Sequence, residues 1–69
     1  MSQDVRKRIA KNVKFYREKK RLTHEELSLI LGFDNSYISK LEKENINITI
    51  DKLAQIANFF EIDILDLLK

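Results

Sequence analysis

The sequence predicts an all-α fold, and three observations support this class. Apolar residues recur at intervals of three and four along nearly the whole chain, which is the spacing of one helix face. Proline is absent and glycine occurs once, so few positions interrupt a helix. Thr23, Thr49 and Asp63 stand directly before apolar runs, where capping residues begin helices. The 69 residues are expected to form one domain over residues 1–69.

The composition excludes several classes of protein. Hydrophobic residues make up 43% of the chain and charged residues 35%, a balance typical of globular proteins. The longest apolar runs, such as LSLILGF, are too short to cross a bilayer, so we expect a cytoplasmic protein with no membrane partner. The chain has one histidine and no cysteine, which leaves no thiolate metal site and too few groups for catalysis. No enzyme activity, metal, cofactor or small-molecule ligand is expected.

Positive charge is concentrated in the first segment. Residues 1–21 hold nine Lys and Arg against two Asp and Glu, a net charge of +7, whereas the rest of the chain has a net charge of −5. Within this segment Val5, Ile9 and Val13 follow one another at steps of four, which predicts a helix over about residues 4–20. The basic side chains then occupy its other faces.

A second helix is predicted to start at His24. In the segment THEE, the Thr23 hydroxyl can accept a hydrogen bond from the helix and Glu26 can reach back to the Thr23 amide, an arrangement called a capping box. The expected buried residues of this helix are Leu27, Ile30 and Leu31. Gly32 follows where a left-handed residue would end the helix.

Three more helices are predicted after this glycine. Asp34 is the expected cap of the third helix and Asn45 its expected end. The segment NINITID alternates polar and apolar residues, but a single strand would have no partner, so we interpret it as a loop. Thr49 would cap a fourth helix, with Ile50 on its apolar face, and Asp63 a short fifth helix.

The residues between His24 and Leu41 have the spacing of a helix-turn-helix unit. Two helices that cross steeply over a short turn need a small residue where their backbones approach, here Ser28, and a residue that permits positive φ, here Gly32. The apolar anchors on the inner sides would be Leu27, Leu31, Phe33, Ile38 and Leu41. Each feature is weak alone, and together they are a strong signature.

Through these features residues 22–68 resemble the Cro and phage-repressor class of XRE-type helix-turn-helix regulators. The resemblance implies a five-helix fold like that of lambda repressor, in which the second and third helices form the helix-turn-helix. Within the class, SYISKLE followed by NITI is most similar to restriction-modification controller proteins. The implied function is transcriptional regulation, with autoregulation, by a homodimer bound to a symmetric operator in double-stranded DNA.

The resemblance also implies roles for individual residues, with the third helix in the major groove of the DNA. Base edges would be contacted by Asn35 and Ser36 in its first turn and by Ser39 and Lys40 one turn later. Phosphate contacts are implied at Thr23, His24, Tyr37, Lys43, Asn45 and Asn47. Three positions depart from the pattern of the class: His24 stands where glutamine is usual, Glu44 where glycine is common and Ile46 where a basic residue is common.

Two further roles come from the same resemblance. Arg17 and Glu42 match a pair that forms a salt bridge in relatives, which implies a tie between the first and third helices. Glu25 lies near the position where related activators touch RNA polymerase, so it is a candidate polymerase contact. An acidic residue in the first turn of a helix also complements the helix dipole, which is the alternative reason for Glu25.

The C-terminal segment is the expected dimer interface. Relatives often carry small or polar residues at the places of Phe59 and Leu65, and Leu68 adds further apolar area. These three side chains would form an exposed apolar patch unless another chain covered them. The alternative function is an antitoxin-type protein-interaction module that also binds its operator.

Overall fold

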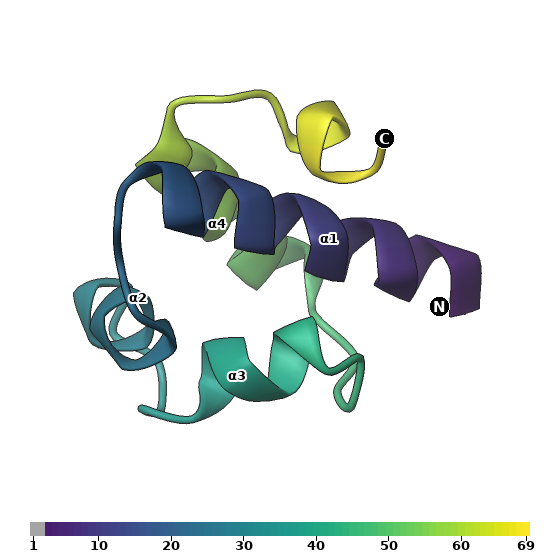
Figure 1. The fold of residues 1–69 in the computed structure, drawn as a ribbon. Helices are drawn as coiled ribbons and strands as arrows, with labels where there is room; N and C mark the ends of the chain where they lie inside the picture. Colours follow the sequence, from purple (N-terminus) through teal and green to yellow (C-terminus); the bar gives the residue numbers. More distant parts are fainter. Residues whose placement is uncertain (1–2) are drawn as a thin grey trace.

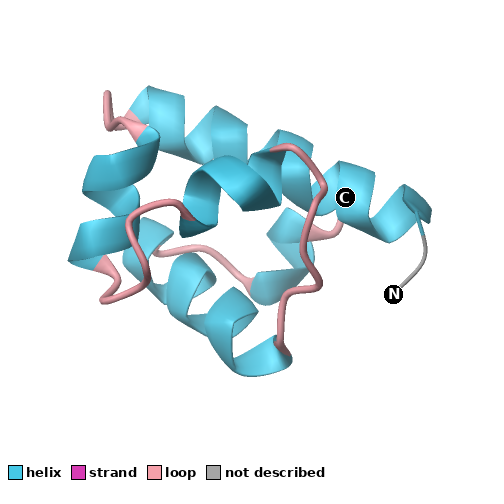
Figure 2. Cartoon of the chain, turned by 90° about the horizontal axis from the view of Figure 1, so that it is seen from below, coloured by secondary structure: helices cyan, strands magenta, loops and turns pink. Residues whose placement is uncertain are grey.

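The computed structural model describes residues 3–69, and all its regular structure is helical. α1 covers Gln3–Lys19, α2 His24–Ile30, α3 Tyr37–Glu42 and α4 Ile50–Phe60 (Figure 1). A 3-10 helix of four residues, η1, covers Ile64–Leu67. Figure 2 shows these helices joined by loops, with no strand in the described part of the chain. The predicted all-α class is confirmed.

The last helix differs from the prediction of five α-helices. The backbone N–H groups of Asp66 and Leu68 donate to the carbonyls of Asp63 and Leu65, three residues earlier, which is the hydrogen-bond pattern of a 3-10 helix. Such a short segment cannot build the ladder of an α-helix. Its cap is the predicted one, since Asp63 Oδ1 accepts from the Leu65 amide at 2.9 Å. The structure therefore has four α-helices within residues 3–69.

α1 lies at the centre of the packing. In Figure 1, α3 lies on one side of α1 and η1 on the other, and both contact it directly. Ile9 and Val13 of α1 are fully buried, as the apolar spacing predicted. They belong to one core cluster whose other fully buried members include Leu27, Ile38, Ile56 and Leu67.

Two apolar residues that were expected in the core are on the surface. Ile30 is 54% exposed and Ile50 is 70% exposed. Ile30 is the last residue of α2, whose buried residues are Leu27 and Ser28. Ile50 is the first residue of α4, and the buried face of that helix begins one turn later. Helical spacing thus predicted burial wrongly at these two terminal positions.

Each of the four α-helices is followed, within two residues of its end, by a residue with a left-handed backbone. These residues are Arg21, Gly32, Glu44 and Glu61, with φ of 59°, 75°, 61° and 58°. In each case the following amide donates to a carbonyl five residues earlier, as Asn45 N does to Lys40 O at 3.0 Å. This is the Schellman motif, which pairs the last carbonyls of a helix. Gly32 was predicted for this role, whereas the left-handed residue after α3 is Glu44 and not the predicted Asn45.

Arg21→Gly is expected to raise the free energy of unfolding by about 0.5 to 1 kcal/mol. A left-handed backbone costs a residue with a Cβ roughly 1 to 2 kcal/mol relative to glycine, and the more flexible unfolded chain offsets part of this gain. Lys14→Gly, at an exposed position inside α1, is the matched control and should lower the free energy of unfolding by about 1 kcal/mol. Urea denaturation measures both, and a less stable Arg21→Gly protein would contradict the expectation.

Candidate nucleic-acid interface

A buried serine joins α2 to α3. Ser28 is fully buried, and its Oγ donates to the His24 carbonyl at 2.9 Å and accepts from the Ile38 amide at 3.1 Å. Ile38 is the second residue of α3, and the first amides of a helix have no partner within it. A residue of α2 therefore caps α3, a role beyond the small size expected of Ser28. Loss of the hydroxyl would leave a buried amide unpaired, at a cost of about 1 to 3 kcal/mol.

The predicted cap of α3 at Asp34 is wrong. α3 begins at Tyr37, and the N-cap position belongs to Ser36, whose side chain makes no cap hydrogen bond. Asp34 instead accepts a hydrogen bond from the Ser36 hydroxyl at 3.0 Å. Asn35 and Ser36, which were expected in the first turn of the helix, lie in the turn that precedes it. Their positions depend on what holds the two ends of this turn.

An aromatic pair lies at the two ends of this turn. The ring centroids of Phe33 and Tyr37 are 4.8 Å apart. Lys52 of α4 lies over both rings, with its Nζ 4.5 Å from the Tyr37 centroid and 5.5 Å from the Phe33 centroid. All three side chains are half-buried, and burial raises the pKa of Tyr37. No local pattern in the sequence predicts this cluster, because Lys52 is far from the two aromatic residues along the chain.

The carboxylate of Glu42, at the end of α3, receives the guanidinium of Arg17. Arg17 Nε donates to Glu42 Oε2 at 2.7 Å and Nη2 donates to Oε1 at 3.1 Å, so the ion pair is bidentate. The two side chains are 9% and 7% exposed. The third nitrogen, Arg17 Nη1, donates to the Leu22 carbonyl at 2.7 Å. Hydrogen bonding to Glu42 raises the pKa of Arg17, so the guanidinium stays charged.

His24, the first residue of α2, shares the same carboxylate. Its Nε2 lies 3.0 Å from Glu42 Oε1, and 43% of its side chain remains exposed. The preceding residue, Thr23, forms the predicted capping box: its Oγ1 accepts from the Glu26 amide at 3.1 Å, and its own amide donates to Glu26 Oε1 at 2.8 Å. The ring expected to contact phosphate is thus oriented by α3, a contact that the sequence did not predict.

The remaining candidate residues lie on α3 and in the loop after it. Lys40, Lys43, Asn45 and Asn47 are exposed, and Ser39 is half-buried. The loop is held at Glu44, whose Oε1 accepts from Gln3 Nε2 at 3.3 Å. The glutamate that replaces the glycine common in the class therefore keeps the left-handed backbone and adds a contact to the start of α1.

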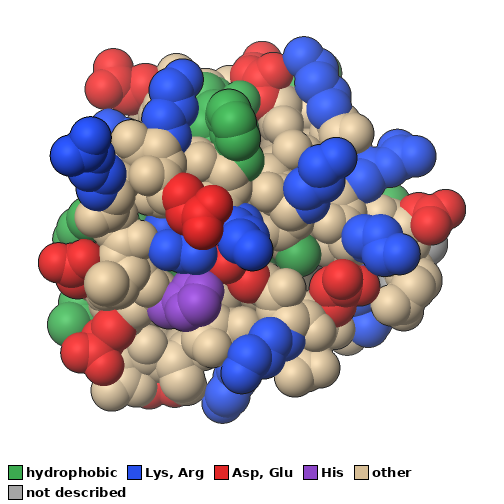
Figure 3. All heavy atoms as spheres, in the orientation of Figure 1, with side chains coloured by type: hydrophobic (Ala, Val, Ile, Leu, Met, Phe, Trp, Pro, Cys, Tyr) green, Lys and Arg blue, Asp and Glu red, His purple; other side chains and the backbone are tan. Residues whose placement is uncertain are grey.

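The basic residues of the first segment do not form one continuous patch on the face that α1 crosses. Figure 3 shows Lys and Arg side chains spread over this face, with acidic side chains among them. Asp4 and Glu18 contribute negative charge from α1 itself. The first segment is strongly basic in the sequence, but on this side of the fold its basic side chains lie among acidic ones.

The three residues expected at the dimer interface differ in exposure. Leu65 is 61% exposed, whereas Phe59 and Leu68 are half-buried and pack against the core. Asn12 of α1 donates through Nδ2 to the Leu67 carbonyl at 2.9 Å, which holds η1 against α1. Leu65 is therefore displayed on a turn that is fixed to the core.

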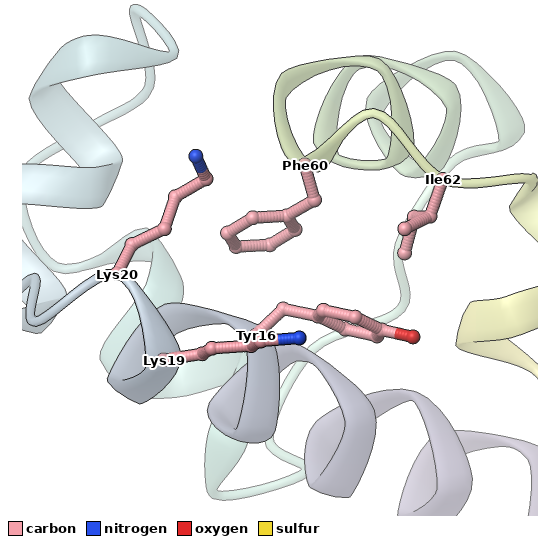
Figure 4. Close-up of a pocket in the computed structure, with 5 residues that line it drawn as sticks. All are labelled: Tyr16, Lys19, Lys20, Phe60 and Ile62. Atoms are coloured by element: carbon pink, nitrogen blue, oxygen red, sulfur yellow. The ribbon is translucent and has the colours of Figure 1, made fainter.

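A hollow of about 340 Å³ opens between the C-terminal ends of α1 and α4. Its lining residues are Tyr16, Lys19, Lys20, Phe60 and Ile62 (Figure 4). The Tyr16 and Phe60 rings are 5.6 Å apart, and the two lysines lie over the rings of Phe15 and Phe59. None of the residues expected to contact DNA lines this hollow.

Among residues 3–69, no group of three His, Asp or Glu side chains is placed to hold a metal ion. No helix in this range combines the length and the hydropathy that a membrane span requires.

Comparison with known sequences identifies the family. Residues 10–69 match the family described as a helix-turn-helix domain, so the chain belongs to the helix-turn-helix domain family. Control protein C.SmaI of Serratia marcescens is 33% identical over 54 residues. This match covers 78% of the chain and 64% of that relative, so the chain spans less than two thirds of its length.

Two solved structures have the same fold. The hypothetical transcription factor NHTF from Neisseria superposes with a TM-score of 0.91 at 30% identity, over 97% of this chain and 77% of that one. The restriction-modification controller protein C.AhdI from Aeromonas hydrophila gives a TM-score of 0.81 at 22% identity, over 90% of this chain and 94% of that one. The second likeness shows the fold alone. The family match and the 30% identical structure agree with the predicted resemblance to XRE-type helix-turn-helix proteins.

Glu42→Gln is expected to lower the free energy of unfolding by about 3 kcal/mol. The substitution leaves the buried Arg17 guanidinium without a counter-charge, and removal of one partner of such a pair costs about 3 to 5 kcal/mol. Glu18→Gln is the control, because Glu18 Oε2 lies 3.9 Å from Arg17 Nη2 and its side chain is 58% exposed. The control should change stability by less than about 0.5 kcal/mol. Equal effects of the two substitutions in urea denaturation would contradict the assignment.

Proposed function

We propose that the chain is a sequence-specific DNA-binding regulator of transcription in which α2 and α3 form the helix-turn-helix. One observation carries the proposal: the contacts of Ser28 and Glu42 fix a turn and a short helix whose outer side chains are polar. Helices of seven and six residues are not stable alone, so these contacts determine their geometry. Direct reading of base edges requires such a fixed surface. Membership of the helix-turn-helix family supports the proposal.

The proposed base-reading residues are Asn35 and Ser36 in the turn and Ser39 and Lys40 on α3. An asparagine side chain can pair with adenine through two hydrogen bonds, and a lysine can donate to guanine. Because Asn35 precedes the helix, its reach depends on the conformation of the turn and not on helical geometry. We expect an operator that contains both kinds of base.

The proposed phosphate contacts surround these readers. They are Thr23 and His24 at the start of α2, Tyr37 at the start of α3, and Lys43, Asn45 and Asn47 after α3. Such contacts set the register of the protein on the duplex and carry no sequence information themselves. The bond between His24 Nε2 and Glu42 Oε1 links one phosphate contact to the position of α3.

Asn35→Ala is expected to relax the preference for particular base pairs, whereas Lys43→Ala should weaken binding to all sequences similarly. Loss of one paired base contact removes about 1 to 3 kcal/mol of discrimination, and loss of a phosphate contact lowers the salt dependence of affinity by about one unit of slope. Selection of bound sequences from random DNA, followed by titrations at several salt concentrations, measures both quantities. The reverse pattern would overturn the assignment of the two residues.

We further propose that the active form is a homodimer on a symmetric operator. One reading surface contacts few base pairs, and two-fold pairing with reading helices about 34 Å apart supplies the specificity. Leu65 would be the centre of the interface, with Phe59 and Leu68 beside it. η1 packs on a different side of α1 from α3, so pairing there leaves α3 uncovered (Figure 1).

Leu65→Asp is expected to weaken the dimer at least tenfold, because a charge would be buried against apolar side chains. Leu29→Asp is the matched control, since Leu29 and Leu65 are both 61% exposed, and it should leave the dimer unchanged. Sedimentation equilibrium at micromolar concentration measures the association. A wild-type monomer would count against pairing and favour the alternative, a protein-interaction module with another partner.

The similarity to a control protein supports a narrower proposal, that the chain regulates its own gene as a restriction-modification controller. Regulation would then depend on protein concentration through dimerisation, without a small-molecule ligand. Glu25 is exposed in the first turn of α2, next to the proposed DNA-binding surface. It is the proposed contact for RNA polymerase if the chain activates transcription.

A further inference from the structure

The turn that carries Asn35 and Ser36 is held from outside the helix-turn-helix unit. The turn begins at Phe33 and ends at Tyr37, and the two rings are in contact with centroids 4.8 Å apart. Lys52 of α4 places its ammonium group 4.5 Å from one centroid and 5.5 Å from the other. One cation therefore contacts both ends of the segment that the proposed readers occupy.

We propose that Lys52 is a positioning residue for base recognition, which fixes the turn containing Asn35 and Ser36 by lying over the rings of Phe33 and Tyr37. This inference rests on the proposed DNA-binding function. It assigns a role in sequence discrimination to a helix outside the proposed helix-turn-helix, and to a lysine that would itself touch no base. Phe33, Tyr37 and Lys52 together form what we call the aromatic clamp.

The backbone of Lys52 is fixed, so its side chain has a defined origin. Its amide donates to Thr49 Oγ1 at 3.2 Å, which makes Lys52 part of the capped first turn of α4. The next residue, Leu53, is 2% exposed and anchors this turn in the core. The lysine stem crosses from the core-anchored helix to the two rings, and the half-buried position strengthens the attraction between the cation and the ring faces.

Backbone hydrogen bonds hold the two ends of the turn, since the Phe33 amide donates to the Ser28 carbonyl at 2.8 Å and the Tyr37 amide to the Asp34 carbonyl at 2.9 Å. The Ser36 side chain does not cap α3, and it donates to the Asp34 carboxylate within the turn itself. The amide that would be capped locally, that of Ile38, is bonded to Ser28 of α2. The aromatic clamp adds to these bonds a contact from α4, which lies outside the helix-turn-helix.

A simple phosphate-binding role for Lys52 makes a different prediction. A lysine that neutralises one phosphate lowers the affinity for every sequence when it is removed, and it lowers the salt slope by about 0.9. A positioning lysine instead lowers the preference for the selected operator over a mutated one, and it leaves the salt slope unchanged.

The test compares Lys52→Met, which keeps the stem and removes the charge, with Lys52→Arg, which keeps a cation that stacks on aromatic rings. Lys52→Met should reduce the operator preference at the base pair read by Asn35 roughly three- to tenfold, the scale of one cation–π contact. Lys52→Arg should restore most of it. Lys43→Met is the matched control and should show the opposite pattern, with preference kept and the salt slope reduced.

A second measurement needs no DNA. In amide NMR spectra of the free protein, Lys52→Met should shift the Asn35 and Ser36 signals, and Lys52→Arg should shift them much less. Tyr37→Phe keeps the ring and removes the hydroxyl, so it should leave these two signals in place. Circular dichroism verifies that each variant is folded.

Each outcome has one meaning. Shifted turn amides, a reduced preference, an unchanged salt slope and rescue by arginine support the inference. An unchanged preference with a lower slope makes Lys52 a phosphate contact and overturns it. Unshifted Asn35 and Ser36 amides in a folded Lys52→Met protein overturn the clamp whether or not DNA binds. Absence of DNA binding by the wild-type chain removes the proposed function, and with it the reading role, even where the amide shifts show the clamp.

Discussion

The geometry of the candidate interface depends on the Glu42 carboxylate. It accepts two hydrogen bonds from Arg17 of α1 and lies within hydrogen-bond distance of His24 at the start of α2. Three helices therefore meet at one side chain that is 7% exposed. A buried bidentate ion pair constrains orientation, because each carboxylate oxygen must face its donor. The planar guanidinium can meet the carboxylate in this way only in one relative orientation. The end of α3 is fixed relative to both preceding helices by this requirement.

The start of α3 is fixed by different chemistry. Ser28 supplies a neutral hydrogen bond at the point where α2 and α3 approach, and the rings of Phe33 and Tyr37 pack under Lys52. α3 has six residues, too few for a helix that is stable by itself. α3 is therefore held by an ion pair at its end and by a hydrogen bond and aromatic contacts at its start. These contacts explain how so short a helix can present side chains in fixed positions, as the proposed reading of DNA requires.

The sequence predicted those features that local chemistry determines. The capping box at Thr23, the caps at Thr49 and Asp63 and the left-handed Gly32 depend on residues within a few positions, and all are present. The cap at Asp34 was wrong because a buried residue of another helix, Ser28, provides the bond. Likewise, the contacts of His24 and Lys52 join segments distant in the chain, and no local pattern indicates them. Glutamate at position 44 shows that the Schellman geometry of the helix end, and not residue preference, selects the left-handed position.

The central claim is that the turn before α3, α3 itself and the start of α2 together contact DNA. An NMR titration of the chain with a duplex selected from random DNA tests it most directly. The account predicts that the largest amide shifts occur at Thr23 and His24 and between residues 35 and 47, with little change around the hollow at Tyr16 and Phe60. Shifts concentrated at the hollow, with residues 35 to 47 unaffected, would contradict it.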